Sequence, residues 1–293
     1  MDMIVCVKQV PDTTEVQIDP RTKTLIREGV ASIVNPFDLV ALEEALRIKR
    51  KVGGRITVLS MGPPQAISAL KECLARGADR AVLFSDRIFA GSDTLATSYT
   101  LSLAIQTSKL PYDIIFCGLQ AIDGDTGQVG PGLAEFLNLP VLPNAVEVRV
   151  DEEARSVTIH RKTEEGIEVL RAKWPVLIIA DRDLAKPGNL SDDRFTGIAE
   201  DAVEIWDFNK LGGLRSDYGL EGSATEVIWI GPPKPIGYMK IDPDLPYQER
   251  IRLTLTAGLE SKSSKQIVEG KNPLEAVNEL VRRLVKDEVI ANG

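Results

Sequence analysis

A loop of small residues carries the groups best suited to hold a nucleotide. Residues 118–131 (GLQAIDGDTGQVGP) follow the apolar run 113–117 and precede a helix-like stretch at 132–137. Glycines at 124, 127 and 130 let the backbone approach a bulky ligand closely. The first free N–H groups of the next helix can hydrogen-bond phosphate oxygens, with help from the helix dipole. This combination favours a nucleotide site.

The spacing of the loop matches neither a dinucleotide fingerprint nor a P-loop, and an ordinary Gly/Asp turn at a strand end is an equally open alternative. Asp123 and Asp125 would repel a phosphate if they faced it. We therefore expect these carboxylates to cap the helix or to hold hydroxyl groups. Thr126, Gln128 and the backbone amides are then left for the anion.

Composition and charge exclude several classes of protein. The chain has 293 residues, of which 43% are hydrophobic and 27% charged, as in a soluble globular protein of one large domain or one domain with a sizeable appendage. No apolar run approaches the roughly 18 residues of a membrane span, and the N-terminus lacks a signal pattern, so we expect a cytoplasmic protein without membrane insertion. A net charge of −8 argues against nucleic acid as the main partner.

The cysteines and the single histidine give no sign of a metal site or of a catalytic residue. Cys6, Cys73 and Cys117 are scattered, each in an apolar setting, and are expected to be buried thiols in a reducing compartment. His160 lies in an alternating strand pattern without a serine or cysteine partner, so we expect it to be structural. We predict no metal ligands and no catalytic side chain.

The elements that must position the loop alternate between strand and helix. Strands are predicted at 3–9, 55–61, 80–85 and 113–117, and helices at about 36–49, 64–76 and 92–108. This alternation predicts an α/β fold with a parallel sheet and helices on both faces. A hairpin excursion is predicted within 12–29. After residue 140 the pattern changes, with strands at 146–150, 156–161, 167–172 and 175–180, followed by an irregular polar stretch at 181–204.

Parallel sheets bind ligands outside the carboxyl ends of their strands. Four segments are predicted to meet there, at 6–9, 35–38, 60–63 and 123–131. The helix start at 92–98 joins them, because Thr94, Thr97 and Ser98 are spaced to share one helix face. The alternative for that helix start is a capped surface helix with spare hydroxyls.

The chain is predicted to divide into a nucleotide-binding α/β domain, 1–205, and a C-terminal arm, 206–293. A final helix is expected at about 273–288, started by Asn272 and Pro273 and carrying an apolar stripe. The stripe consists of Leu274, Val277, Leu280, Val281, Leu284 and Val285. It could pack on a partner subunit or back on its own domain, and we favour the partner.

With its segments assembled, the chain resembles the β subunit of an electron transfer flavoprotein. The motifs that carry the resemblance are VKQVP at 7–11, NPFD at 35–38, SMGP at 60–63, GADR at 77–80, the loop at 118–131 and GSAT at 222–225. They cover most of the chain. The resemblance implies the adenine-nucleotide-binding α/β fold of that family and an α subunit that carries its own FAD. Without these motifs, the fold would suggest a nucleotide-binding module that acts alone as a homo-oligomer.

Members of this family bind either a structural AMP or, in the electron-bifurcating group, a second FAD beside an NADH site. Residues 91–98 and 123–131 look like the bifurcating group, because small residues leave space for an isoalloxazine ring and Thr94 and Thr97 can hydrogen-bond the flavin. The resemblance then implies an FAD that accepts electrons from NADH and passes them to the FAD of the α subunit and to a low-potential acceptor. The alternative is an AMP-binding β subunit with a structural role.

The resemblance places the cofactor contacts on three groups of residues. These are Cys6, Asn35, Pro36, Phe37, Asp38 and Met61; then Asp93, Thr94 and Thr97; and finally Asp123, Gly124, Asp125, Thr126, Gly127, Gln128, Val129, Gly130 and Pro131, continuing to Leu133. No side chain is expected to act as acid or base, since a flavin carries the redox chemistry.

The resemblance also implies an acyl-CoA dehydrogenase or another dehydrogenase as a further partner. AMP-type members are expected to dock such enzymes through a lysine-rich loop. The corresponding stretch here, 189–203, is acidic, so docking in the usual way is not predicted. The segment 234–259 is unfamiliar in this family and is a candidate for a partner-specific contact.

Overall fold

The computed structural model describes residues 1–12, 17–18, 25–26, 31–199, 201–225 and 277. Residues Met1–Ile230 form one compact unit, and the fold and the site below belong to it. No helix among the described residues is long and apolar enough to cross a membrane.

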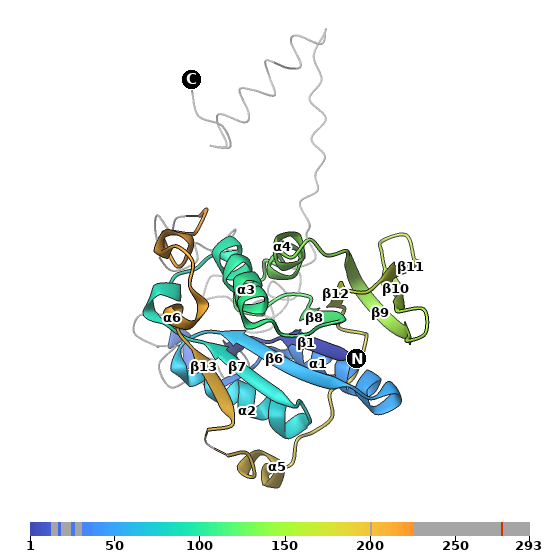
Figure 1. Ribbon diagram of the computed structural model, residues 1–293, viewed down its shortest axis with the longest axis horizontal. Helices are drawn as coiled ribbons and strands as arrows, with labels where there is room; N and C mark the ends of the chain where they lie inside the picture. Colours follow the sequence, from blue (N-terminus) through green and yellow to red (C-terminus); the bar gives the residue numbers. More distant parts are fainter. Residues whose placement is uncertain (13–16, 19–24, 27–30, 200, 226–276, 278–293) are drawn as a thin grey trace, which may run out of the picture. The chain divides into compact units, whose positions relative to one another are not determined.

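A nine-stranded sheet runs through this unit, in the order β11-β10-β9-β12-β8-β1-β6-β7-β13 (Figure 1). Its strands are β1 (Asp2–Cys6), β6 (Arg55–Met61), β7 (Arg80–Phe84), β8 (Ile114–Gly118), β9 (Val141–Asp151), β10 (Ser156–Lys162), β11 (Ile167–Lys173), β12 (Val176–Ala180) and β13 (Val203–Trp206). In the part of the sheet with the order β9-β12-β8-β1-β6-β7-β13, every pair of neighbouring strands is parallel. At the other edge, β10 pairs antiparallel with both β9 and β11. The predicted α/β class is confirmed.

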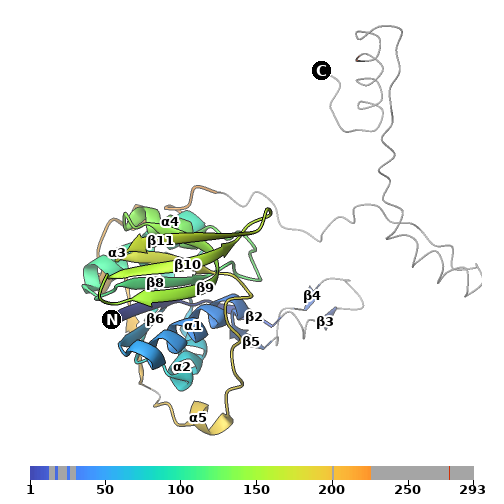
Figure 2. The same ribbon diagram turned by 90° about the vertical axis from the view of Figure 1, so that its right-hand side faces the viewer.

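Helices cover both faces of the sheet. The helices are α1 (Pro36–Val52), α2 (Ile67–Arg76), α3 (Thr94–Ser108) and α4 (Val129–Phe136). Helices α1 and α2 lie on one face, and α3 and α4 on the other (Figures 1 and 2). Shorter elements are the 3-10 turns η2 (Pro64–Ala66), η3 (Arg87–Phe89) and η4 (Arg215–Asp217), and the short helices α5 (Asp192–Thr196) and α6 (Phe208–Leu211).

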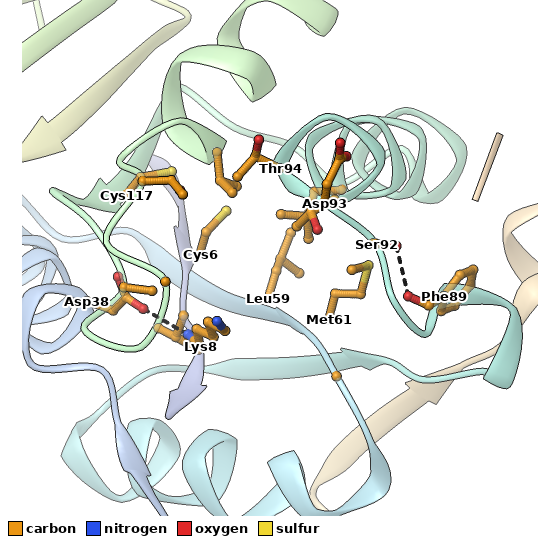
Figure 3. A pocket seen from close by; sticks show the side chains of 18 of the residues that line it. Cys6, Lys8, Asp38, Leu59, Met61, Phe89, Ser92, Asp93, Thr94 and Cys117 are labelled. Atoms are coloured by element: carbon orange, nitrogen blue, oxygen red, sulfur yellow. Dashed lines mark hydrogen bonds between the residues drawn. The ribbon is translucent and has the colours of Figure 1, made fainter. Parts of the chain in front are cut away.

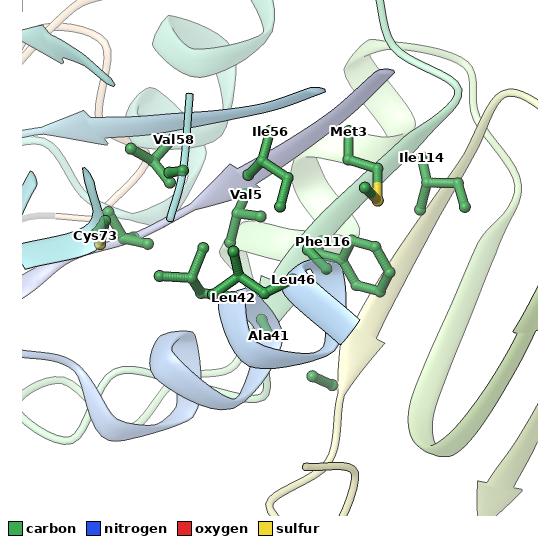
Figure 4. Packing of buried hydrophobic residues seen from close by; sticks show 14 of the residues in the cluster. Met3, Val5, Ala41, Leu42, Leu46, Ile56, Val58, Cys73, Ile114 and Phe116 are labelled. Atoms are coloured by element: carbon green, nitrogen blue, oxygen red, sulfur yellow. The ribbon is translucent and has the colours of Figure 1, made fainter. Parts of the chain in front are cut away.

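Alternate side chains of β1 pack into two separate hydrophobic cores, one on each face of the sheet. Met3 and Val5 point to the face covered by α1 and α2, where they pack with Leu42 and Phe116 (Figure 4). Ile4 and Cys6 belong to the cluster on the face of α3 and α4. Because neighbouring residues of a strand point to opposite faces, a continuous apolar run serves both cores.

The chain reverses its direction of travel across the sheet between β7 and β8. From β1 it proceeds outward to β6 and β7, and it then returns to place β8 on the other side of β1. Such a reversal leaves a crevice at the carboxyl ends of the two central strands, which is where open α/β sheets bind ligands. In this protein the crevice lies beyond Cys6 and Gly118.

Several predicted boundaries were wrong for local reasons. The strand predicted at 3–9 ends at Cys6, and the next segment, β2 (Gln9–Pro11), pairs with β5 (Ser32–Val34) in a separate small sheet. The helix predicted from residue 132 begins at Val129, because proline is tolerated in the first helical turn. The hairpin excursion is confirmed by the pairing of β3 (Gln17–Ile18) with β4 (Leu25–Ile26).

The region after residue 181 holds elements that the sequence did not reveal. Strand β13 pairs in parallel with β7 at the edge of the sheet, and Arg80 forms an ion pair with Glu204 at 2.6 Å between these two strands. The predicted division at residue 206 falls at the end of β13, and the compact unit continues to residue 230. The predicted helix at 273–288 lies outside the described residues apart from Val277, so the arm stays a prediction.

Candidate functional site

A cavity of about 1030 Å³ lies at the crevice beyond β1 and β8. Figure 3 shows its side chains coming from the ends of β1, β6 and β8 and from the start of α3. The residues predicted to contact a cofactor that line it are Cys6, Asp38, Met61, Asp93, Thr94, Thr97, Gly124, Thr126, Gly127, Gln128, Val129 and Gly130. The convergence predicted from five separate segments is therefore present in the structure.

The other predicted contacts do not line the cavity: Asn35, Pro36, Phe37, Asp123, Asp125 and Pro131. Leu133, at the end of the implied range, is fully buried in the core beside α3. Asn35 is buried and serves the loop instead. Its amide nitrogen donates to the Gln120 carbonyl at 2.8 Å, and its side-chain oxygen accepts from the Ile122 N–H at 3.2 Å. It ties the glycine loop to the start of α1.

The two loop carboxylates behave differently from the expectation. Asp123 forms an ion pair with the Lys8 ammonium, at 2.7 Å from Nζ to each carboxylate oxygen, and Asp125 accepts a hydrogen bond from the Gln120 side chain. Within the described part of the chain, no side chain caps α4 and neither carboxylate accepts a hydrogen bond from a hydroxyl group. The predicted capping was wrong because Lys8, 115 residues away, reaches Asp123 from the end of β1. Neutralised in this way, Asp123 repels an anion in the cavity much less.

Three glycines in or beside the loop have two different roles. A Cβ atom added at Gly118 would lie 2.7 Å from the Phe37 carbonyl carbon and 2.8 Å from the Asp38 nitrogen, so Gly118 allows α1 to begin against β8. Gly132 likewise lets α4 pack on Ser98 of α3, 2.6 Å from the added atom. At Gly124 the added atom would meet nothing within 4 Å. Gly124 therefore leaves open space, whereas the other two are packing glycines.

Asp93 holds the start of α3 in place. One carboxylate oxygen accepts from the backbone N–H groups of Leu95 and Ala96, at 2.9 and 3.0 Å. The other accepts from the N–H of Ala224 at 2.8 Å, and from the N–H and the hydroxyl of Thr225, each at 3.0 Å. Desolvation acts to raise the pKa of Asp93, but these hydrogen bonds outweigh it and lower the pKa. With its lone pairs engaged in this way, Asp93 is a positioning group of the cavity wall.

Hydroxyl and amide groups remain available in the cavity. Thr94 donates its hydroxyl to the Gln128 side-chain oxygen at 2.9 Å, which joins α3 to the loop. The Thr97 hydroxyl has no hydrogen-bond partner among the described residues and also lines the cavity. Val129 and Gly130 begin α4, where backbone N–H groups lack partners within the helix. These groups are suited to bind an anionic, oxygen-rich ligand, because they can donate hydrogen bonds to its oxygen atoms.

Asp38 forms part of the cavity floor and is almost completely buried. Its carboxyl group accepts the Lys8 N–H at 2.8 Å, which links the start of α1 to the end of β1 (Figure 3). Burial raises the pKa of Asp38 to about 7, and hydrogen bonds from Asn35, Lys8 and Gly118 offset only part of this effect. Well below that pH the floor therefore carries little negative charge from Asp38.

One wall of the cavity was not predicted from the sequence. Residues 85–90, which follow β7, all line it except Ile88. Asp86 stabilises this segment by accepting hydrogen bonds from the N–H groups of Ile88 at 3.2 Å and Phe208 at 3.1 Å. Lys8 and residues 117–121 also line the cavity, and although the segment 6–9 and the loop from residue 118 were predicted at the site, none of these residues was predicted as a cofactor contact. The signal that could have found residues 85–90 is their position directly after a parallel strand.

The cavity combines apolar walls with a polar end. Leu59, Met61, Phe89 and Leu101 supply apolar surface, whereas the hydroxyls and amides gather at the starts of α3 and α4. Small-molecule sites usually measure roughly 300–1,000 Å³ and have mostly apolar linings with a few placed polar groups. The residues present therefore fit an aromatic nucleotide ligand with phosphate groups. They can bind and orient such a ligand.

Comparison with known proteins gives a consistent result. The model of the electron transfer flavoprotein domain family matches residues 22–208. The electron transfer flavoprotein subunit beta of Clostridium acetobutylicum is 50% identical over 227 residues, covering 78% of this chain and 86% of the relative. Protein FixA of Azotobacter vinelandii is 45% identical over 241 residues, covering 80% and 85%. The caffeyl-CoA reductase-Etf complex subunit CarD of Acetobacterium woodii is 44% identical over 228 residues, covering 78% and 86%.

Proposed function

The chain belongs to the electron transfer flavoprotein family, among its β subunits, and we propose that its cavity binds FAD and receives electrons from NADH. In this proposal the electrons divide between the FAD of the α subunit and a low-potential acceptor. The observation that carries the proposal is the cavity of about 1030 Å³ into which the glycine loop, the start of α3 and the ends of β1 and β6 all open.

The size of the cavity favours FAD over AMP. A volume of about 1030 Å³ stands at the upper end of the usual range for small-molecule sites, roughly 300–1,000 Å³. AMP would fill only the part near the start of α4 and leave the apolar walls beside Leu59 and Phe89 without a ligand. An isoalloxazine ring supplies the flat apolar surface that such walls bind.

The polar end of the cavity supplies groups for phosphate. We propose that the N–H groups of Val129 and Gly130, with the side chains of Thr126 and Gln128, contact the pyrophosphate. The positive end of the α4 dipole favours an anion at this place. The ion pair between Lys8 and Asp123 removes a repulsive charge from the edge of the same loop.

A bound flavin would accept two electrons from a nicotinamide and release them one at a time. The residues of this chain bind it, orient it and exclude water. The Thr97 hydroxyl is free to donate to a flavin oxygen or nitrogen. Burial raises the pKa of Asp38 to about 7, so well below that pH it adds little negative charge to the cavity that would hold the flavin.

The β subunits of this family partner with an α subunit, and we propose that the same holds here. The relative in Acetobacterium woodii bears the name of a reductase-Etf complex subunit. We propose that this chain also works beside a dehydrogenase or reductase. The acidic character of 189–203 argues for a partner surface that differs from the one a lysine-rich loop would dock.

The proposal can be tested by anaerobic titration of the co-expressed αβ complex with NADH. We expect NADH to bleach flavin absorbance in the wild-type complex. Gly124→Leu should lower both the FAD content and the bleaching, because the new side chain would enter the open space of the cavity. Gly188→Leu is the matched control, since its Cβ position is equally open and lies outside the cavity. An AMP-containing complex whose flavin NADH does not reduce would overturn the proposal and leave β a structural role.

A further inference from the structure

Two cysteines stand side by side on the floor of the cavity. Val5 of β1 pairs with Phe116 of β8 in parallel register, so Cys6 and Cys117 occupy the next pair of positions in line. Both belong to the cluster on the face of α3 and α4, and both line the cavity. Figure 3 shows their side chains coming from the two neighbouring strands at the same end of the cavity.

The two thiols are close enough to influence each other. The Cys6 thiol beside it and burial together raise the pKa of Cys117 well above its ordinary range. Neighbouring strands lie about 4.8 Å apart. Disulfides join residues whose Cα atoms are roughly 4.4–6.8 Å apart, so the strand spacing falls within the range that a disulfide needs. Ligand-free, the cavity gives a small oxidant a path to both sulfur atoms.

We propose that Cys6 and Cys117 are an oxidisable dithiol that a hydroperoxide converts to a disulfide when the cavity holds no nucleotide. The formation of the disulfide does not depend on the proposed function. The protection of the thiols by a nucleotide does rest on it, because the ligand would cover the floor of the cavity.

The chemistry balances with hydrogen peroxide as the oxidant. The sulfur of Cys6, as thiolate, attacks one oxygen of the peroxide, so an S–O bond forms and the O–O bond breaks, giving a sulfenic acid and one water. The sulfur of Cys117 then attacks that of Cys6, and the S–O bond breaks with release of a second water. Two thiols are oxidised and one peroxide is reduced, and the thiol hydrogens leave in the two waters.

The third cysteine provides an internal control. Cys73 lies on α2, on the opposite face of the sheet, and is fully buried in the core there. It does not line the cavity, and burial raises the pKa of its thiol well above the ordinary range. A cysteine in such a setting is unreactive. Oxidation of the dithiol should therefore leave Cys73 untouched.

The test is differential alkylation of the αβ complex after exposure to hydrogen peroxide, with each cysteine followed separately by mass spectrometry. In complex freed of nucleotide, we expect the alkylatable thiols of Cys6 and Cys117 to disappear together. The two residues should then be found in one disulfide-linked peptide, and dithiothreitol should restore both thiols. Cys73 should stay alkylatable after unfolding. Oxidation of Cys73 at the same rate, or separate oxidation of Cys6 and Cys117 to sulfinic acids without a linked peptide, would overturn the proposal.

Two further arms separate this proposal from the proposed function. In Cys117→Ser, the sulfenic acid on Cys6 has no neighbouring thiol and should be trapped by dimedone, whereas Cys73→Ser should form the disulfide as the wild type does. Saturating FAD or AMP should slow the disulfide at least tenfold, with binding measured independently. If neither nucleotide binds and the linked peptide still forms, the dithiol proposal stands and the nucleotide proposal fails. If a nucleotide binds and does not protect, the placement of the dithiol under the ligand is wrong.

Discussion

The two faces of the central sheet are built from the same strands and have opposite characters. On one face, the apolar stripes of α1 and α2 press against Met3, Val5 and Ile56, and the fully buried side chains leave a closed core (Figure 4). On the other face, the helix α3 begins with threonine and serine and carries no charged residue along its length. There the strand ends open into the cavity.

This difference between the two faces shows what creates the cavity. It depends on how far from the sheet each helix begins and on which side chains lie in its first turn. Helix α1 begins directly against the end of β8, because Gly118 lets its first turn come close. Ten residues, 119–128, separate the end of β8 from the start of α4, and they form a loop of small residues at the rim. The same parallel sheet therefore has a closed face and a face with a cavity. Substitutions can test this contrast directly.

The largest effect is expected in the closed core. Leu42→Ala removes a fully buried side chain between α1 and the sheet and should lower the free energy of unfolding by about 2–5 kcal/mol. Leu101→Ala, on the open face, should cost less because Leu101 already borders the cavity. Urea unfolding of both variants makes the comparison. Equal losses of unfolding free energy in the two variants would contradict the distinction between the two faces.

Asp38, at the border between the two faces, predicts a pH dependence. Its folded pKa of about 7 lies above the ordinary 3.8, so the folded protein holds a proton that the unfolded chain releases between these values. Stability from this group is thus fully present below pH 3.8 and is lost as pH rises to about 7, with a slope of up to about 1.4 kcal/mol per pH unit.

Asp38→Asn cannot lose this proton. The difference in unfolding free energy, variant minus wild type, should therefore grow as pH rises from about 4 to 7, by an amount on the order of 4 kcal/mol over the whole interval. Denaturant unfolding at half-unit steps of pH measures it. A difference that stays constant across that range would show that Asp38 is ionised in the folded protein.

The packing glycine and the open glycine of the loop should respond differently to one methyl group. Gly118→Ala forces Cβ against the backbone of Phe37 and Asp38 and should destabilise the fold by about 1–3 kcal/mol. Gly124→Ala adds the same atom to open space and should change stability by less than about 0.5 kcal/mol. Thermal unfolding of the pair decides the matter, and the reverse ranking would refute the assignment of the two glycines.

The smallest predicted change concerns the face with the cavity. Thr97→Val keeps the shape of the side chain and removes a hydroxyl that has no partner among the described residues, so stability should change little. If this hydroxyl contacts the flavin, affinity for FAD should fall by about tenfold, the equivalent of one hydrogen bond. Thr107→Val, at the far end of α3, is the control. Equal affinities for both variants would exclude Thr97 from the contact.

The regular part of the fold was predictable because its signals are local. The run RITVLSM was predicted as a strand at 55–61, and β6 has those bounds, while Pro36 marked the start of α1 correctly. The convergence of segments on one site also followed from sequence, since parallel strands share the edge where they end. The loop was placed correctly on this basis, and with it Thr94, Thr97 and Gly127.

What the sequence could not reveal depends on distant pairings. Strand β13 has only four residues in a polar stretch and exists through its pairing with β7, more than 120 positions earlier. The partner of Asp123 is Lys8, across 115 residues, so no local pattern indicated the ion pair that replaced the expected cap. Asp93 was predicted as a cofactor contact from the family resemblance, and its carboxylate accepts hydrogen bonds from Ala224 and Thr225, which no local pattern indicated.

The measurement that tests the central claim most directly is the nucleotide content of the purified αβ complex, released by denaturation and quantified for each species. The account predicts two FAD and no AMP for each heterodimer, one FAD in α and one in the cavity beyond Cys6 and Gly118. One FAD with one AMP would contradict it, because the large open face of the sheet would then hold a mononucleotide without redox chemistry.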